Sequence, residues 1–245
     1  MRLNFNLIFF LVFGFLVNGH AQKGITTFGL NYKPIIPNRI IGTYDVPFND
    51  GSFRSSMQQR VGNSLGMIIR QGLTKNISLE TGISFTQRNF NLNFSVDDTV
   101  SYSNNGKVRF VAYEIPVKCL VFIRLGKQLY MNNSIGASFN YFPSDVSVDF
   151  PIKSNEYFSL EGARLNRVQG AMLADIGFEY RTKRNGYFYF GGAFNLPFTS
   201  IVTFAMAYEY TPHEIVVREN VRGSYLTVDL RYYFNEKPRV EQKRK

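Results

Sequence analysis

Apolar and polar residues alternate with a period of two along most of the chain. In the clearest run, from Tyr113 to Leu125, every odd position is apolar, whereas the even positions include Glu114, Lys118 and Arg124. The last such segment, Tyr225 to Phe234, repeats the pattern. Since successive side chains of a β-strand point to opposite faces, this alternation predicts strands with one apolar and one polar face.

Turn residues divide the pattern into separate segments with a regular order of links. The predicted strands, eight in number, are 24–32, 61–73, 77–94, 110–125, 129–142, 170–181, 187–197 and 223–234. Tight links at 74–76, 126–128 and 182–186 alternate with long polar links at 33–60, 95–109, 143–169 and 198–222. Strict alternation of short and long links is typical of outer-membrane barrels. We therefore expect an all-β fold, an eight-stranded antiparallel transmembrane β-barrel.

The apolar stretch from Phe198 to Tyr210 leaves one question of strand number open. It either extends the seventh strand beyond the membrane or raises the number of strands to ten.

Charged residues occupy the same strand faces as small residues, which indicates a filled lumen. An eight-stranded barrel has an interior just wide enough for side chains to fill. Acids and bases that alternate there can satisfy one another, whereas lone buried charges would be costly. The predicted lumen network is Arg70, Glu80, Arg88, Glu114, Lys118, Arg124, Asp175, Glu179, Arg181, Asp229 and Arg231. We expect a barrel plugged by side chains, not an open pore.

Aromatic residues gather near the strand ends, as in the two interfacial belts of a membrane barrel. Toward the long links they are Tyr32, Phe90, Phe94, Phe110, Phe139, Tyr141 and Phe142. Toward the tight turns they are Tyr180, Tyr187, Phe188, Tyr232 and Phe234.

The two ends of the chain differ in composition from the barrel. Arg2, an apolar run from Leu7 to Val17, and small residues at Gly19 and Ala21 form the pattern of a secretory signal peptide cleaved after Ala21. The alternative, an N-terminal anchor, would need about 20 apolar residues. The expected organisation is a signal peptide over 1–21, a barrel over 22–234 and a basic tail over 235–245, with both mature termini in the periplasm.

The formal net charge of the protein is +10, and much of the excess lies at one end of the predicted barrel. The tail carries five basic and two acidic residues, a net +3, and Lys75, Lys127, Lys183 and Arg184 lie at the tight turns. The tail either touches anionic lipid or a partner, or is a solvated end.

Three stretches carry a resemblance to a known family. They are LETGISFTQRNF from Leu79 to Phe90, AYEIPVKCLVFI from Ala112 to Ile123, and LTVDLRYYF from Leu226 to Phe234. In this order they resemble the Bacteroidota outer-membrane β-barrel family, the porin-family or PorT-family proteins. The resemblance implies the fold and the outer membrane, with Leu230, Tyr232 and Phe234 as the signal read by the barrel-assembly machinery. The tail beyond Phe234 departs from a typical member.

Residues suited to catalysis or metal binding are few. The single cysteine, Cys119, excludes a disulfide framework and is expected to face lipid, while Pro116 should mark a bulge or kink. His213 is the sole histidine of the mature chain and reads as polar surface, since nothing singles out a serine partner. Asp97 and Asp98 lack the spaced oxygen ligands of a calcium site. We expect no enzyme activity, cofactor, metal or nucleic-acid partner.

The expected function is structural or binding, through long extracellular loops, with 33–60 and 143–169 as the contact surfaces. One alternative is a PorT-like accessory component of a secretion or gliding apparatus, and a second is a narrow porin or small-solute transporter. The expected partners are outer-membrane lipid and lipopolysaccharide, the assembly machinery during insertion, and a secretion-apparatus or extracellular partner.

Overall fold

The computed structural model describes residues 25–37, 40, 44–97, 101–153, 156–210 and 213–235. All regular secondary structure in these ranges is β-strand. The predicted signal peptide and nearly all of the predicted basic tail lie outside the described residues. In these ranges, no helix has the length and hydropathy needed to cross a membrane.

A closed ring of antiparallel strands forms the first part of the fold. Its strands are β1 (Thr26–Ile36), β3 (Phe53–Gly72), β4 (Ile77–Asp97), β5 (Ser101–Arg124), β6 (Leu129–Tyr141), β9 (Val168–Arg181), β10 (Tyr187–Pro197) and β13 (Tyr225–Tyr233). Each strand pairs with the next along the chain, and β1 closes the ring by pairing with both β3 and β13. The predicted eight-stranded barrel is thereby confirmed.

The two faces of the barrel wall differ in polarity as the alternation predicts. On β5, Val117 and Val121 are exposed on the outside, with Cys119 between them. Glu114 and Lys118, which point inward, are only 4% and 1% exposed. Apolar side chains thus cover the outside of the cylinder, where lipid can solvate them, and charged side chains fill its inside.

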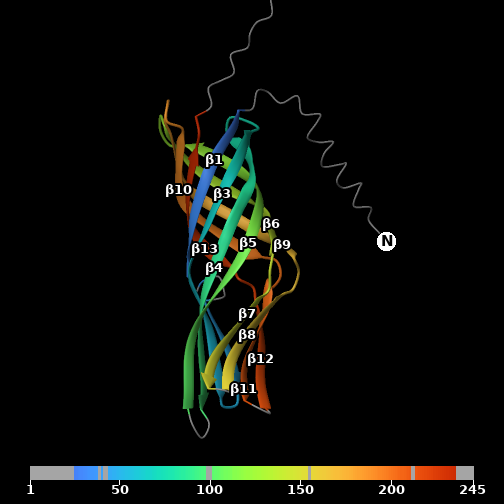
Figure 1. The fold of residues 1–245 in the computed structure, drawn as a ribbon. Helices are drawn as coiled ribbons and strands as arrows, with labels where there is room; N and C mark the ends of the chain where they lie inside the picture. The colour runs from blue at the N-terminus through green and yellow to red at the C-terminus, as the bar shows by residue number, and fades with distance from the viewer. Residues whose placement is uncertain are drawn as a thin grey trace, which may run out of the picture.

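The tight turns all lie at one end of the barrel, called here the turn end. At the first turn, the Thr74 hydroxyl accepts hydrogen bonds from the backbone N–H groups of Asn76 and Ile77, at 3.2 and 3.0 Å. At the third, Gly186 adopts a φ of 82°, which favours glycine. The chain enters β1 and leaves β13 at this same end (Figure 1).

Beyond the other end of the barrel the chain builds a second module, which we call the tower. Five strands lie there: β2 (Asp45–Asp50), β7 (Val146–Lys153), β8 (Glu156–Arg164), β11 (Val202–Tyr210) and β12 (His213–Val221). The last four form a separate antiparallel sheet in the order β12-β11-β8-β7. This sheet lies beside the prolonged ends of β3, β4 and β5, with β2 added to β3 (Figure 1).

The prediction of four long polar loops was therefore wrong. The links 33–60, 143–169 and 198–222 contain strands, and most of 95–109 belongs to β4 and β5. Neither prediction for Phe198 to Tyr210 holds, because β11 pairs with β8 and β12 and not with any barrel strand.

The prolonged strands reverse the polarity of both faces where they leave the barrel. The inward face of β4 changes from Thr86 and Arg88 to Phe90 and Leu92, while its outward face changes from Phe85 to Asn89. Within the barrel the outside meets lipid, whereas in the tower it meets water, so the apolar side chains must turn inward. The lumen side of the same strand thus becomes a hydrophobic core.

Aromatic side chains from both sheets pack in the tower core. Phe94 stacks on Phe158 with ring centroids 5.1 Å apart, and Phe204 meets Phe90 and Phe110, each at 6.4 Å. The prediction that Phe90, Phe94, Phe110 and Phe142 belong to a lipid belt was wrong, since all four are buried in this core. They lie on the inward face, beyond the level at which the wall stops facing lipid.

Two irregularities interrupt the ladders of the ring. The β3–β4 register shifts between Arg60 and Asn63, where the strands enter the tower. On the β4–β5 ladder, Thr81 pairs with Val117 and Ser84 with Glu114, and no pair is formed between them, beside Pro116. A proline lacks the N–H that a ladder requires.

Candidate functional site in the barrel lumen

The centre of the lumen holds carboxylates and cations brought together from different strands. The Glu80 carboxylate lies 3.0 Å from Lys118 Nζ and 3.0 Å from Arg231 Nη1, and it also accepts a hydrogen bond from the Tyr233 hydroxyl. Arg70 Nη2 approaches it at 3.4 Å. Glu80, Lys118 and Arg231 lie on β4, β5 and β13, so these contacts tie together strands on different sides of the ring.

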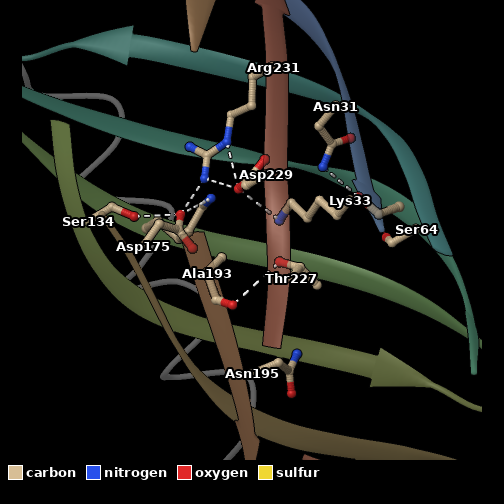
Figure 2. Close-up of polar contacts among 12 residues, drawn as sticks. Asn31, Lys33, Ser64, Ser134, Asp175, Ala193, Asn195, Thr227, Asp229 and Arg231 are labelled. Atoms are coloured by element: carbon tan, nitrogen blue, oxygen red, sulfur yellow. Dashed lines mark hydrogen bonds and ion pairs between the residues drawn. The ribbon is translucent and has the colours of Figure 1, made fainter. Parts of the chain in front are cut away.

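Arg231 links this centre to two further carboxylates. Its guanidinium contacts both Asp175 and Asp229, and its Nε lies 3.0 Å from Asp229 Oδ2 (Figure 2). Lys118 Nζ and the Ser134 hydroxyl also donate to Asp175, at 2.8 and 2.7 Å. Each charge thus has more than one partner of opposite sign or a hydroxyl, which a buried ion cluster needs to offset its desolvation.

Nearer the turn end, Glu179 lies between two arginines. Arg70 Nη1 and Arg181 Nε each donate to its carboxylate at 2.7 Å. The Arg70 guanidinium lies over the Tyr233 ring, 3.6 Å from its centroid, and Arg181 lies over Tyr130 at 4.1 Å. Aromatic faces next to the arginines supply a cation–π contribution where water is scarce.

A cavity of about 340 Å³ opens at this end, lined by Arg70, Arg181 and Lys75 among other residues. Arg70 and Arg181, which belong to the charged network, form part of its wall.

Toward the tower, the polar interior ends in a second group of side chains. The Glu114 carboxylate accepts hydrogen bonds from the Tyr225 hydroxyl at 2.8 Å and from Asn195 Nδ2 at 3.2 Å. Arg88 is 1% exposed and lies over the Tyr225 ring, 4.8 Å from its centroid, yet none of its nitrogens has a hydrogen-bond partner among the residues that the structure describes. Arg88 thus marks the boundary between the polar lumen and the apolar tower core.

The structure brings together most of the residues predicted for the lumen network, but not all. Arg70, Glu80, Lys118, Asp175, Glu179, Arg181, Asp229 and Arg231 form connected ion pairs. Glu114 and Arg88 face the same interior but stand apart from these pairs. Arg124 lies elsewhere: it is exposed at the turn end and donates to the carbonyl oxygen of Gly126 at 2.9 Å.

Sequence reasoning missed Lys33, which belongs to the network. Its Nζ lies 3.6 Å from Asp229 Oδ2 (Figure 2). The sequence predicts Lys33 at the start of the long link 33–60, whereas β1 continues to Ile36. The alternation of Thr27, Asn31 and Lys33 with Phe28, Leu30 and Tyr32 is the signal that could have placed it in the lumen.

Among the described residues, the network contains five cations and four carboxylates. The cations are Lys33, Arg70, Lys118, Arg181 and Arg231, and the carboxylates are Glu80, Asp175, Glu179 and Asp229. No group of three or more metal-ligating side chains occurs in the described part of the chain. The cations exceed the carboxylates by one, so the paired charges offset most of one another, and their side chains block the lumen.

The three residues proposed as an assembly signal share the outward face of the last strand region. Leu230 and Phe234 are exposed, and the Tyr232 ring packs between Phe188 and Phe234 at 5.0 and 5.2 Å. His213 begins β12 and packs against Tyr210 at 5.5 Å. Asp97 ends β4 and is exposed, while Asp98 lies outside the described residues.

No protein-family model and no curated protein matches the chain. Among solved structures, it is similar to the outer membrane protein OprG from Pseudomonas aeruginosa, with 11% identity, a TM-score of 0.46, and coverage of 88% of this chain and 98% of that one. It is also similar to the translocator domain of the autotransporter NalP from Neisseria meningitidis, with 6% identity, a TM-score of 0.22, and coverage of 94% and 95%. The β-domain of the Bordetella autotransporter BrkA gives 6% identity, a TM-score of 0.21, and coverage of 87% and 99%. The assignment of the barrel rests on the strand ladders of this chain and not on these likenesses.

Proposed function

We propose that this protein is a non-enzymatic outer-membrane barrel that holds the tower as a rigid binding surface outside the cell. One observation carries the proposal: the lumen is closed by paired charges, while the tower has a hydrophobic core of its own. A filled barrel cannot serve as a wide channel, and a packed module is a preformed surface for contacts, unlike mobile loops. The turn end then faces the periplasm, together with both termini.

The contact surfaces belong to the tower as a whole. The sequence favours two links as contact regions, 33–60 and 143–169. These links contribute β2, β7 and β8 to the tower. The proposed orientation is supported by the short turns at one end and the long insertions at the other, as in barrels of the outer membrane. Leu230, Tyr232 and Phe234 then present an outward face to the assembly machinery during insertion.

Two measurements test this proposal. In planar bilayers, the purified mature chain should give no steady large conductance, because Glu80, Lys118 and Arg231 occupy the lumen. On intact cells, an epitope inserted between β11 and β12, near 211–212, should be detected from outside. A stable open channel, or detection only after the outer membrane is permeabilised, contradicts the proposal. A stable open channel would favour instead the narrow porin or transporter.

The PorT-like accessory role is a second candidate, favoured by the basic turn end. Lys75, Lys127, Lys183 and Arg184 are exposed there, and they could bind an acidic periplasmic surface of a secretion apparatus. Pull-down from detergent-solubilised outer membranes separates the two candidates. The second role is supported if the protein is recovered bound to a secretion apparatus and if this fraction is lost when the four residues are replaced by glutamine. Recovery of the barrel without any partner contradicts it.

A further inference from the structure

The outside of the barrel and tower carries a sharp boundary between an apolar and a polar row. Leu65, Phe85, Tyr113 and Tyr141 are directly paired across β3, β4, β5 and β6, and all four are exposed. Such a row, containing tyrosine tips, is what the lipid–water interface of a membrane barrel requires. Asn89 lies four residues after Phe85 on β4, which places it about 13 Å closer to the tower along the strand.

The row at Asn89 is strongly basic. Arg60 pairs with Asn89 across β3 and β4, and Asn89 pairs with Arg109 across β4 and β5. Lys107 pairs with Asn91 in the next row. Since neighbouring strands lie about 5 Å apart, the two arginines flank Asn89 with their Cα atoms ~10 Å from each other.

A hollow of about 290 Å³ lies at this row, lined by Arg60, Lys107 and Arg109 together with Gln87, Asn89 and Asn91 among others. The register shift of β3 builds it, because Arg60 and Val61 are both exposed although they are consecutive. Gly62 permits the close approach of the strands: a Cβ there would lie 2.3 Å from the Gln87 carbonyl oxygen.

Amide side chains fix the floor of this hollow. Asn89 Nδ2 donates to the Val61 carbonyl at 2.8 Å, and Gln87 Nε2 donates to Asn89 Oδ1 at 2.9 Å. The three cations are not neutralised: within the described part of the chain, none of Arg60, Lys107 and Arg109 forms an ion pair. The outward side chains beside them on β3, β4 and β5 are mainly amides and hydroxyls, with Arg54 and the exposed Val61. The exposed acid Asp45 of β2 pairs with Gln58, two residues before Arg60, and forms no ion pair among the described residues, while Asp97 lies at the far tip of β4.

We propose that Arg60, Lys107 and Arg109 form a site for the phosphorylated sugar headgroup of an outer-leaflet glycolipid. Guanidinium groups bind phosphate oxygens in pairs, and amides satisfy sugar hydroxyls. The height of the row commits the site to a lipid headgroup, because the row stands about 13 Å along the strand beyond the residues that mark the lipid–water interface. This inference rests on the membrane placement proposed above, and it names the lipid chemistry that this face recognises.

The test is native mass spectrometry of the full mature chain in detergent, with bisphosphorylated lipid A as the probe. The triple variant Arg60→Gln, Lys107→Gln, Arg109→Gln should bind it at least about tenfold more weakly, because it lacks the three charged groups that would donate hydrogen bonds to the phosphates. The matched control is Lys75→Gln, Lys127→Gln, Lys183→Gln, which removes the same charge at the turn end and should leave the affinity unchanged. Lipid A stripped of phosphate should bind wild type as weakly as the triple variant binds the intact lipid.

Heat-modifiable migration of each variant, followed before the binding experiment, verifies that the barrel is folded. Equal binding by the triple variant, an equal loss in the control, or equal binding of the stripped lipid overturns the proposal. Displacement of the lipid by an equimolar amount of inorganic phosphate also overturns it, because the site would then recognise phosphate alone. Another result is that the lipid fails to bind although the conductance and epitope measurements support a closed lumen and an external tower. That result would refute the lipid site alone, and the proposed function would stand.

Discussion

Glu80 is the residue on which the closed lumen depends most. Its carboxylate contacts Lys118, Arg231, Arg70 and Tyr233, and it is fully buried. Removal of one partner from a buried ion cluster leaves charges without compensation, whereas burial of the whole cluster can be close to neutral.

The change Glu80→Gln should therefore destabilise the barrel by about 3–5 kcal/mol. The measurement is the temperature at which the compact band of the heat-modifiable barrel converts to the unfolded one. The control Glu219→Gln makes the same chemical change on an exposed position of β12 and should have almost no effect. An equal conversion temperature for Glu80→Gln and wild type would show that the pairs contribute nothing.

Replacement of Arg88, unlike that of Glu80, should not destabilise the barrel. Arg88 is buried between Tyr225 and Phe142, and no acceptor in the described part of the chain forms a hydrogen bond with its guanidinium. Replacement by methionine, which keeps much of the length and removes the charge, should leave the conversion temperature unchanged or raise it. A loss as large as that of Glu80→Gln would mean that an anion holds Arg88 in the folded protein.

At the scale of elements, the tower is stabilised by packing between two sheets. Phe204 of β11 is fully buried between Phe90 and Phe110, and Gly162 of β8 leaves room for its ring, since a Cβ there would lie 2.6 Å from it. This contact connects the separate sheet to the strands that continue from the barrel.

The change Phe204→Ala should cost about 3–5 kcal/mol, and the cost should fall on the tower. Limited trypsin digestion in detergent is expected to cut the variant at tower sites such as Arg164 and Arg218, while the barrel stays protected. Phe198→Ala, at an exposed phenylalanine just after β10, is the control and should keep the wild-type pattern. Uniform protection of Phe204→Ala would argue against a core that unites the two sheets.

Tyr157 gives the tower a dependence on alkaline pH. Its hydroxyl donates to Glu209 across β8 and β11, and this hydrogen bond raises the pKa of Tyr157 above its ordinary value of 10.0. The neutral form is favoured in the folded state, so this stabilisation is complete below about pH 10 and is lost as the pH rises through the raised pKa. Trypsin resistance of the tower should fall as the pH rises above about pH 10, and less steeply in Tyr157→Phe. Identical profiles for the two proteins would exclude this role.

The barrel strands could be predicted from the sequence because lipid and a charged lumen impose opposite polarities on alternate residues, as at Val117 and Lys118. The tower could not be predicted in the same way. Its inward side chains, such as Phe90 and Leu92, continue the charged face of the same strand, and the outward ones, such as Asn89, continue the apolar face. The sequence does contain this reversal of polarity after Arg88. It becomes apparent only when the even-numbered and odd-numbered positions of the strand are examined separately.

The lumen network was only partly predictable for a different physical reason. Period-two alternation gives the face of a residue but not its height along the strand, so Arg124 was grouped with Lys118 although it lies beyond the lumen. Pairs between distant strands, such as Arg231 with Glu80, depend on the stagger of a closed ring, which local pattern does not specify.

At the scale of the whole molecule, the chain combines a sealed membrane-spanning cylinder with a packed tower on one side of it. The same strands, β3, β4 and β5, serve both parts, so the tower is fixed to the barrel without a flexible linker. For the binding role proposed above, this means that no affinity would be lost to the ordering of mobile loops.

The sole cysteine offers the most direct test of which face of the wall meets lipid. Cys119 is exposed on the outside of β5, between Val117 and Val121. A small fluorophore on Cys119 of the chain reconstituted in bilayers should be quenched by lipids that carry a nitroxide in the acyl chain and be insensitive to aqueous iodide. The same fluorophore on Asn91→Cys in a Cys119→Ser background, on the outside of the tower, should show the reverse. Quenching of the Cys119 label by iodide would instead mean that the apolar face does not meet lipid, and the transmembrane assignment would be lost.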